Sequence, residues 1–287
     1  MKRLFTLFAV LAIFTLASCS EGGSDNLNPN DKNEQPNDGN EDTETPEDDN
    51  DDSEQPSNCI YYTTTNDEEL SLNSDTSTLF GVTLLSNIYE NGQGVMTFDD
   101  AITSIGANAF YECTNLESVS IGKSVTSIGK YAFYYCKSLV SITLPKSLST
   151  IEDGAFLGCW SLVNITIPQG VSFIGASAFD GCTSIENITI PNGITSIKSA
   201  TFNGCSSLTS ITIPQSVNSI ESRAFWSCAA LAEVYCKSTT PPAGEFTMFG
   251  QNAIGRKIYV PTQSVEAYKS ADGWSTYADD IVGKDFE

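Results

Sequence analysis

The fold is decided by a stretch that reads FLGCWSLVNITIP at residues 156–168, because versions of it recur every 23 residues. A Phe, a Cys three residues later and a Leu or Ile three residues after that form columns that never slip. Self-similarity at a fixed short period is the signature of repeat proteins, in which each unit packs on its neighbours. The columns are Phe110, Phe133, Phe156, Phe179, Phe202 and Phe225; Cys113, Cys136, Cys159, Cys182, Cys205 and Cys228; and Leu116, Leu139, Leu162, Ile185, Leu208 and Leu231.

Each unit is predicted to contain a short β-strand. Apolar and polar residues alternate in the last part of residues 162–167, several of them are β-branched, and Pro168 follows; this combination favours a strand over a helix. A second apolar pair, Val171 and Ile174 in this unit, recurs with the same period. One unit cannot bury its apolar residues alone, whereas stacking places each residue on its copy in the next coil. The sequence therefore predicts a β-rich solenoid of about six coils.

The pattern Phe-x-x-Cys-x-x-Leu, continued as Leu-x-x-Ile-x-Ile, resembles the BspA-like leucine-rich repeats of Bacteroides surface proteins. It covers about residues 99–236, and the resemblance implies a right-handed leucine-rich-repeat solenoid. We expect residues 59–98 and 237–287 to form an N-terminal and a C-terminal cap, since a repeat stack needs its open ends covered. Another strand-like stretch before a proline, residues 258–261, is expected outside the repeat register.

The first residues are typical of an exported protein. Lys2 and Arg3 precede an apolar run at residues 4–17, which has the layout of a secretory signal and is shorter than the roughly 20 residues that span a membrane. The sequence that ends in Cys19, Leu-Ala-Ser-Cys, resembles the lipobox of bacterial lipoproteins. This resemblance implies a signal peptide at residues 1–18 and a Cys19 that carries the lipid anchor.

Residues 19–58 are predicted to be a disordered acidic tether. Between residues 20 and 58 the chain has fourteen acidic residues and one basic residue, with almost no apolar ones. Such a composition cannot bury enough apolar surface to fold. The tether is either a stalk of functional length or a solvated spacer.

The composition excludes several classes of function. The chain has no histidine, which removes Ser-His-Asp and Cys-His catalytic groups and histidine-ligated metals. A net charge of −22 argues against a nucleic-acid partner, because phosphates are held by clustered Lys and Arg. The sequence contains no Cys-x-x-Cys pair of the kind that binds zinc. The sequence predicts no enzyme, no cofactor and no metal site.

The six aligned cysteines are predicted to form a ladder of buried thiols. Copies in adjacent coils have parallel Cα–Cβ vectors, so their Cβ atoms are about 4.8 Å apart, whereas a disulfide prefers about 3.8 Å. The resemblance to leucine-rich repeats also places Cys or Asn where a small polar group meets turn backbone. No disulfide partner is predicted for Cys59.

Two groups of residues are candidates for ligand binding. The first group occupies outward positions on three predicted strands and is small and polar: Ser141, Thr143, Asn164, Thr166, Asn187 and Thr189. The second group consists of Tyr134, Tyr135 and Trp160 in the turns of two neighbouring coils. Exposed aromatic patches often mark interaction surfaces. The alternative, which the sequence favours, is that these rings fold over the corner and cover the Phe column.

The leading hypothesis is a cell-surface lipoprotein, anchored by lipid in the outer membrane. The BspA-like resemblance implies binding or adhesion to host proteins, glycans or other cells. The alternative is a lipoprotein that faces the periplasm and scaffolds an envelope complex, with no host ligand. Ser20, Glu21 and Asp25 weakly resemble the acidic surface-export signal of Bacteroides lipoproteins, which favours the first hypothesis.

Overall fold

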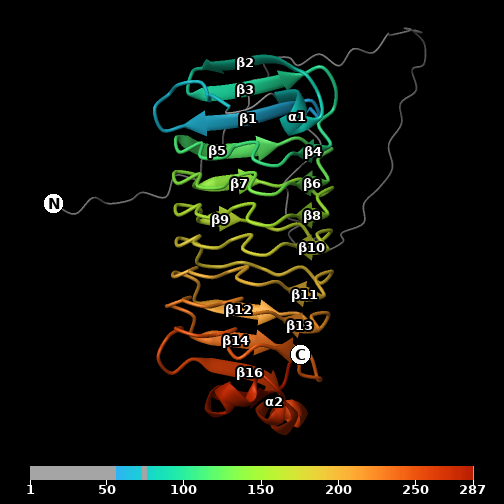
Figure 1. Cartoon of the computed structure of the whole chain (residues 1–287), viewed down its shortest axis with the longest axis vertical. Helices are drawn as coiled ribbons and strands as arrows, with labels where there is room; N and C mark the ends of the chain where they lie inside the picture. The colour runs from blue at the N-terminus through green and yellow to red at the C-terminus, as the bar shows by residue number, and fades with distance from the viewer. Residues whose placement is uncertain (1–55, 73–75, 287) are drawn as a thin grey trace, which may run out of the picture. The chain divides into compact units, whose positions relative to one another are not determined.

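The computed structural model of the chain describes residues 56–72 and 76–286. The predicted signal peptide, Cys19 and the tether as far as residue 55 lie outside the described residues. The described residues form a stack of coils with a three-stranded antiparallel segment at one end and short helices at the other (Figure 1). No helix in this part of the chain is long and apolar enough to cross a membrane.

The elements are β1 (Cys59–Thr64), α1 (Thr76–Phe80), β2 (Leu84–Glu90), β3 (Gln93–Phe98), β4 (Ser104–Ile105), β5 (Leu116–Ile121), β6 (Ser127–Ile128), β7 (Ser141–Thr143), β8 (Thr150–Ile151), β9 (Asn164–Ile165), β10 (Phe173–Ile174), β11 (Ser196–Ile197), β12 (Ser210–Ile213), β13 (Ser219–Ile220), β14 (Glu233–Cys236), β15 (Ala243–Gly244), β16 (Lys257–Pro261), the 3-10 helix η1 (Thr262–Ser264), α2 (Val265–Ser270), the 3-10 helix η2 (Ser275–Asp280) and β17 (Ile281–Lys284).

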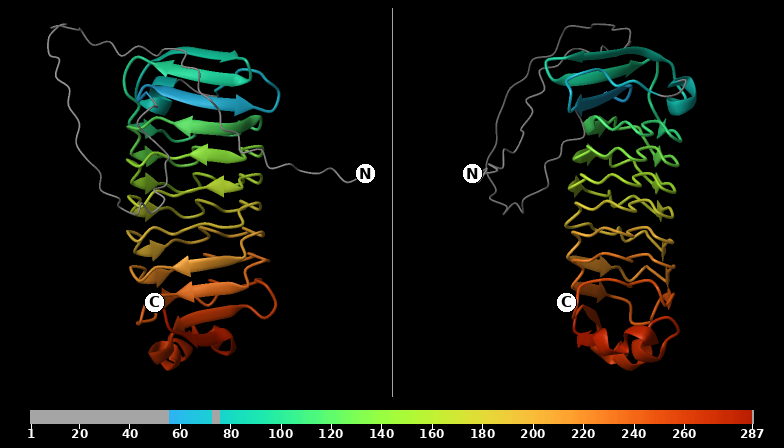
Figure 2. Two further views of the ribbon diagram at one scale, coloured as in Figure 1. Left: turned by 180° about the vertical axis from the view of Figure 1, so that it is seen from behind. Right: turned by 60° about the vertical axis from the view of Figure 1, so that its left-hand side comes forward.

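The strands of the coils stack in two parallel ladders on two sides of the solenoid (Figure 2). One ladder contains β5, β7 and β9, then, after a gap, β12, β14, β16 and β17; the other contains β4, β6, β8 and β10, then β11, β13 and β15. Partner residues are 23 apart, as in the pair Ser118 and Ser141. The predicted leucine-rich-repeat solenoid is confirmed.

The predicted number of coils is wrong, because the solenoid has about eight turns rather than six. The strand at residues 257–261 lies in the ladder, where Val234 pairs with Ile258, and it is one residue outside the 23-residue register, as expected. The Phe column likewise continues to Phe249, whose ring stacks on Phe225 at 5.4 Å. Both spacings are 24 residues, so one inserted residue hides this coil from a fixed-period comparison.

The N-terminal end of the sheet is covered by antiparallel strands. β1 pairs with β5 on one side and with β3 on the other, and β2 forms the outer edge. A parallel stack would otherwise expose the backbone groups of β5, and an open strand edge is a template for unwanted pairing. The reversal of strand direction thus ends the ladder without a further repeat.

The core is one continuous column of buried side chains. Consecutive Phe rings stack nearly parallel, from 4.9 Å between Phe110 and Phe133 to 5.6 Å between Phe179 and Phe202. The Phe, Cys and Leu columns are almost fully buried in every coil. Complete burial of a large apolar side chain contributes about 1.5–3 kcal/mol. Because each ring contacts copies on both sides, this stabilisation is shared between neighbouring coils.

Candidate functional site

The cysteine column forms a ladder of thiol hydrogen bonds. Cys136 Sγ donates to the carbonyl of Phe110 in the preceding coil at 3.0 Å, and the same contact recurs at 3.1–3.3 Å for the four later cysteines of the column. Burial raises the pKa of Cys159 well above its ordinary value. Only the thiolate is a good nucleophile or metal ligand, so these cysteines support the backbone of the corner and do not form a reactive site. The described residues contain no metal-binding group of three Cys, His, Asp or Glu residues.

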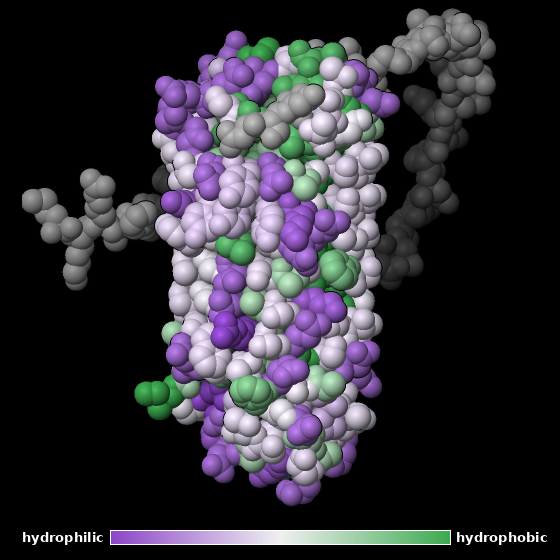
Figure 3. Space-filling model, in the orientation of Figure 1, coloured by the Kyte–Doolittle hydropathy of each residue, from purple (hydrophilic) through white to green (hydrophobic). Residues whose placement is uncertain are grey.

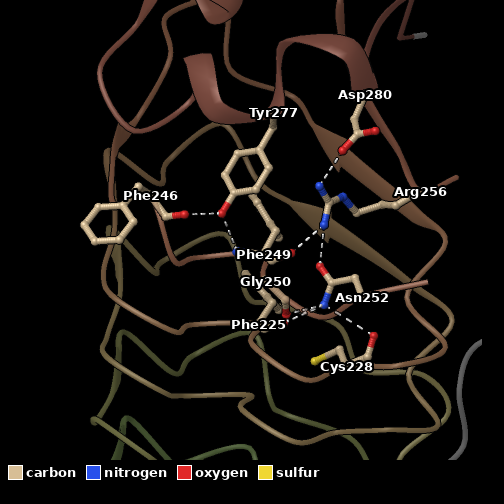
Figure 4. A network of polar contacts seen from close by, with 9 residues as sticks. All are labelled: Phe225, Cys228, Phe246, Phe249, Gly250, Asn252, Arg256, Tyr277 and Asp280. Carbon is tan, nitrogen blue, oxygen red and sulfur yellow. Dashed lines mark hydrogen bonds and ion pairs between the residues drawn. The ribbon is translucent and has the colours of Figure 1, made fainter. Parts of the chain in front are cut away.

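The ladder ends in a network of polar residues (Figure 4). Asn252 occupies the cysteine position of the last coil, and its Nδ2 donates to the carbonyl of Phe225 at 2.8 Å. Arg256 donates to the carbonyl of Phe249, to Asn252 Oδ1 and to Asp280. This network satisfies the last carbonyl of the corner where no further cysteine follows.

The main candidate for a binding site is the aromatic corner, which we define as Tyr111, Tyr131, Tyr134, Tyr135 and Trp160. These rings contact one another across three consecutive coils. Tyr134 stacks on Tyr111 at 4.7 Å, meets Tyr131 edge-on at 5.6 Å and touches Tyr135 at 4.5 Å. Tyr135 continues to Trp160 at 5.8 Å. The structure therefore brings Tyr134, Tyr135 and Trp160 together.

Glycines in the next coil make room for two rings of the aromatic corner. A Cβ on Gly158 would lie 2.8 Å from the ring of Tyr135, and a Cβ on Gly154 would lie 2.3 Å from the ring of Tyr131. These rings lie over the backbone of the neighbouring turn, whereas Trp160 leaves 44% of its surface exposed. The corner thus has a fixed base of tyrosines and one projecting tryptophan.

Two lysines border the aromatic corner. Lys137 Nζ lies 5.0 Å from the ring centroid of Trp160 and 5.5 Å from that of Tyr135. Lys130 Nζ lies 5.2 Å from the centroid of Tyr131 and 3.9 Å from Asp153. A cation near an aromatic face is favoured electrostatically. Sequence reasoning missed both lysines, although the position of Lys137, 23 residues before Trp160, was a usable signal.

The small polar candidates form a separate group on the strand face. Ser141 and Thr143 lie on β7, and the backbone of Asn164 lies on β9. Thr166 follows β9, while Asn187 and Thr189 belong to no strand. A groove of about 310 Å³ opens beside this unpaired segment and is lined by Thr166, Asn187 and Thr189, among others. Figure 3 shows one face of the repeats, on which hydrophilic and hydrophobic residues are mixed.

The repeats match a known family model. Residues 103–232 match six copies of the model described as BspA type Leucine rich repeat region, in agreement with the regular solenoid and its Phe column. This part of the chain, which is under half of its length, is thus similar to BspA-type leucine-rich repeats. Repeat solenoids of this kind are typically binding scaffolds with extended surfaces.

Several solved structures are similar to the chain. A leucine rich repeat protein of T. pallidum is 34% identical over 47% of this chain and 64% of its own, with a TM-score of 0.46. A leucine-rich repeat protein of Bacteroides ovatus is 25% identical over 62% and 50%, with a TM-score of 0.44. A leucine rich cell surface protein of Faecalibacterium prausnitzii is 22% identical over 56% and 64%, with a TM-score of 0.31. The chain thus spans half to under two thirds of these proteins, and no curated protein matches it.

Proposed function

We propose that this protein is a lipid-anchored lipoprotein of the outer membrane, exposed at the cell surface, whose repeat domain binds a host protein, a glycan or another cell. The signal-like residues 1–18 and the lipobox-like Cys19 support the anchor. The acidic residues that follow support a tether between the anchor and the repeats. The BspA-type region supports a binding role for the domain.

The aromatic corner carries the binding part of this proposal. Tyr and Trp are enriched among the hot-spot residues of protein interfaces, because a large rigid side chain loses little conformational entropy on binding. Here the tyrosines are already held by stacking, and Trp160 projects beside Lys137. An aromatic group that is fixed before binding costs less to order on binding. The groove on the strand face, with Thr166, Asn187 and Thr189, would supply weaker polar contacts.

Adhesion of whole cells tests the binding role. Cells that carry the Trp160→Ala variant should bind immobilised mucin or matrix proteins at least about tenfold less well than wild-type cells, since hot-spot residues contribute 2 kcal/mol or more. Phe173→Ala is the matched control, because Phe173 is 41% exposed on β10, outside the aromatic corner. Equal loss in both variants, or no loss in either, would contradict a role for the aromatic corner.

Protease treatment of intact cells tests the proposed location. An unfolded tether is a preferred cleavage site, so added protease should release the repeat domain from intact cells. Protection until the outer membrane is permeabilised would instead favour the alternative, a scaffold that faces the periplasm. A periplasmic protein held at the outer membrane serves as the integrity control.

A further inference from the structure

A second aromatic feature lies on the strand face near the C-terminal end. Tyr235 on β14 and Tyr259 on β16 are register partners, and their rings stack at 4.9 Å with an angle of 13°. The Tyr235 hydroxyl donates to Glu233 at 2.7 Å. That hydrogen bond, with some burial, raises the pKa of Tyr235 to about 12. The hydroxyl therefore remains a hydrogen-bond donor to Glu233.

This region holds three lysines, Lys237, Lys257 and Lys284, and one carboxylate, that of Glu233, so the cations outnumber the acid. Lys284 Nζ lies 5.1 Å from the ring centroid of Tyr235 and 5.3 Å from that of Tyr259. Because it is almost equally far from two stacked rings, it sits at the rim of the stack, with its N–H groups available to a ligand. Lys237 and Lys257 are also exposed at these strands. None of the three lysines pairs with a carboxylate within the described residues, although residues 59–287 carry 22 acidic and 11 basic residues.

A groove adjoins the stacked tyrosines. It measures about 370 Å³ and is lined by Asn187, Ile188, Thr189, Ser210, Thr212 and Lys237. Thr212 is the register partner of Tyr235, so the groove runs up to the tyrosine from the preceding coil. Its lining combines hydroxyl and amide groups with one cation. Such a lining suits a ligand with many hydroxyl groups and a negative charge.

We propose that this groove and the Tyr235–Tyr259 stack form a binding site for an acidic saccharide. The sugar hydroxyls meet Thr189, Ser210 and Thr212, an apolar ring face packs on Tyr235, and the carboxylate or sulfate contacts Lys237 and Lys284. Hydroxyl and amide side chains beside an aromatic ring supply what sugar hydroxyls and an apolar sugar face require, and a tetraglutamate peptide serves as the probe for the alternative, an acidic peptide. The proposal is independent of the aromatic corner.

Calorimetric titration of the full chain in detergent tests this site. The probes are a galacturonate tetrasaccharide, its fully methyl-esterified form and a sulfated tetrasaccharide from heparin. Wild-type protein should bind one or both acidic probes, more weakly at higher salt, and should not bind the ester. Lys237→Gln and Lys284→Gln should each lower the affinity about tenfold, as expected for the loss of a charged hydrogen bond.

Matched variants separate this site from the aromatic corner. Trp160→Ala should leave saccharide binding unchanged, and Lys237→Gln should leave adhesion to deglycosylated matrix proteins unchanged. Thermal unfolding of each variant checks that the exposed substitutions preserve the fold. The proposal is overturned if neither acidic probe binds, if the ester binds as tightly as the acid, if a tetraglutamate peptide binds equally well, or if neither lysine variant loses affinity.

Discussion

The interior coils and the last coil satisfy the same backbone group in different ways. In the interior, the carbonyl of each column Phe from Phe110 to Phe202 accepts a hydrogen bond from the cysteine thiol of the next coil, as Phe133 does from Cys159. At the C-terminal end, the carbonyl of Phe249 accepts instead from Arg256, which is held by Asn252 and Asp280. The difference shows that a neutral thiol suffices where another coil follows, because the stack itself excludes water.

The end of the stack needs a stronger hydrogen-bond donor for its last Phe carbonyl. No further coil covers Phe249, so its carbonyl would be left without the thiol donor that every interior coil supplies. Arg256 brings two charged donors, while its guanidinium also lies 5.6 Å from the ring of Phe249 and 5.0 Å from that of Tyr277. Bonds to charged groups are stronger than neutral ones, but they require a partner for the charge. Asp280, which directly precedes β17, provides that partner and joins the last strand to the network.

The largest effect is expected from a break in the interior column. Phe156→Ala should lower the free energy of unfolding by about 4 kcal/mol, because it removes a ring stacked on both sides and leaves a cavity. Urea denaturation of the full chain measures this. Phe173→Ala, at a 41% exposed position, should cost less than about 1 kcal/mol. Similar losses for both variants would show that the column does not carry the stability assigned to it.

The next largest effect is expected at the end of the stack. Arg256→Met should cost about 3 kcal/mol, because it leaves the Phe249 carbonyl and Asp280 without their partner in a largely buried site. Lys130→Met breaks an ion pair whose two side chains are about half exposed and should cost less than about 1 kcal/mol. The same urea experiment compares the two. A cost for Arg256→Met as small as that for Lys130→Met would show that the interior and the end do not differ in this respect.

Exchanging the cysteine of an interior coil and the asparagine of the last coil tests the comparison further. Cys159→Asn should cost about 2 kcal/mol, because an amide does not fit a fully packed interior position. Asn252→Cys should cost less, about 1.5 kcal/mol. It keeps one donor for the Phe225 carbonyl and loses the bonds to the Cys228 and Gly250 carbonyls and to Arg256, which retains the Phe249 carbonyl and Asp280 as partners. Thermal unfolding ranks the two variants. The reverse order would mean that the last coil depends more on its side-chain type than the interior does.

The smallest effect per residue is expected from alkaline pH. Burial raises the pKa of Cys113 to about 11 and that of Cys228 to about 12, whereas an unfolded thiol has a pKa of about 8.5. Above that value the unfolded chain loses thiol protons that the folded chain keeps, so stability falls as the pH rises. At pH 9 each buried thiol should cost about 0.8 kcal/mol relative to pH 7. Urea midpoints from pH 7 to 9.5, in reductant, should fall less steeply for Cys159→Ala than for wild type.

Periodicity alone predicted most of the interior. The 23-residue columns identified the Phe stack, the buried thiols and the strands, because identical neighbours must meet when identical units stack. The 23-residue period does not continue past Cys236, because one inserted residue between Cys236 and Phe249 moves the spacing to 24. A comparison at a fixed period does not recognise a coil that follows an insertion. The backbone hydrogen bonds of the ladder still form, because the inserted residue lies outside the strands.

The candidate site was predictable only in part. The sequence placed Tyr134, Tyr135 and Trp160 in turns of neighbouring coils. Lys137 lies 23 residues before Trp160, so the same period places these two residues in one column. It left open whether these rings cover the corner or project from it. The structure gives different roles to different rings, because Gly154 and Gly158 have no side chain and let Tyr131 and Tyr135 lie flat on the next turn.

The sequence by itself determined that this protein is a stack of repeats, since apolar residues that recur at a fixed period are buried together when the units stack in register. Only the tertiary structure decided how the stack ends. Arg256, Tyr277 and Asp280 belong to no repeat column, and they meet Asn252, the last position of the cysteine column, because η2 (Ser275–Asp280) folds back onto that corner. Interior contacts repeat with the chain and can be read from its period, whereas the contacts at an end occur once and depend on where the chain folds back.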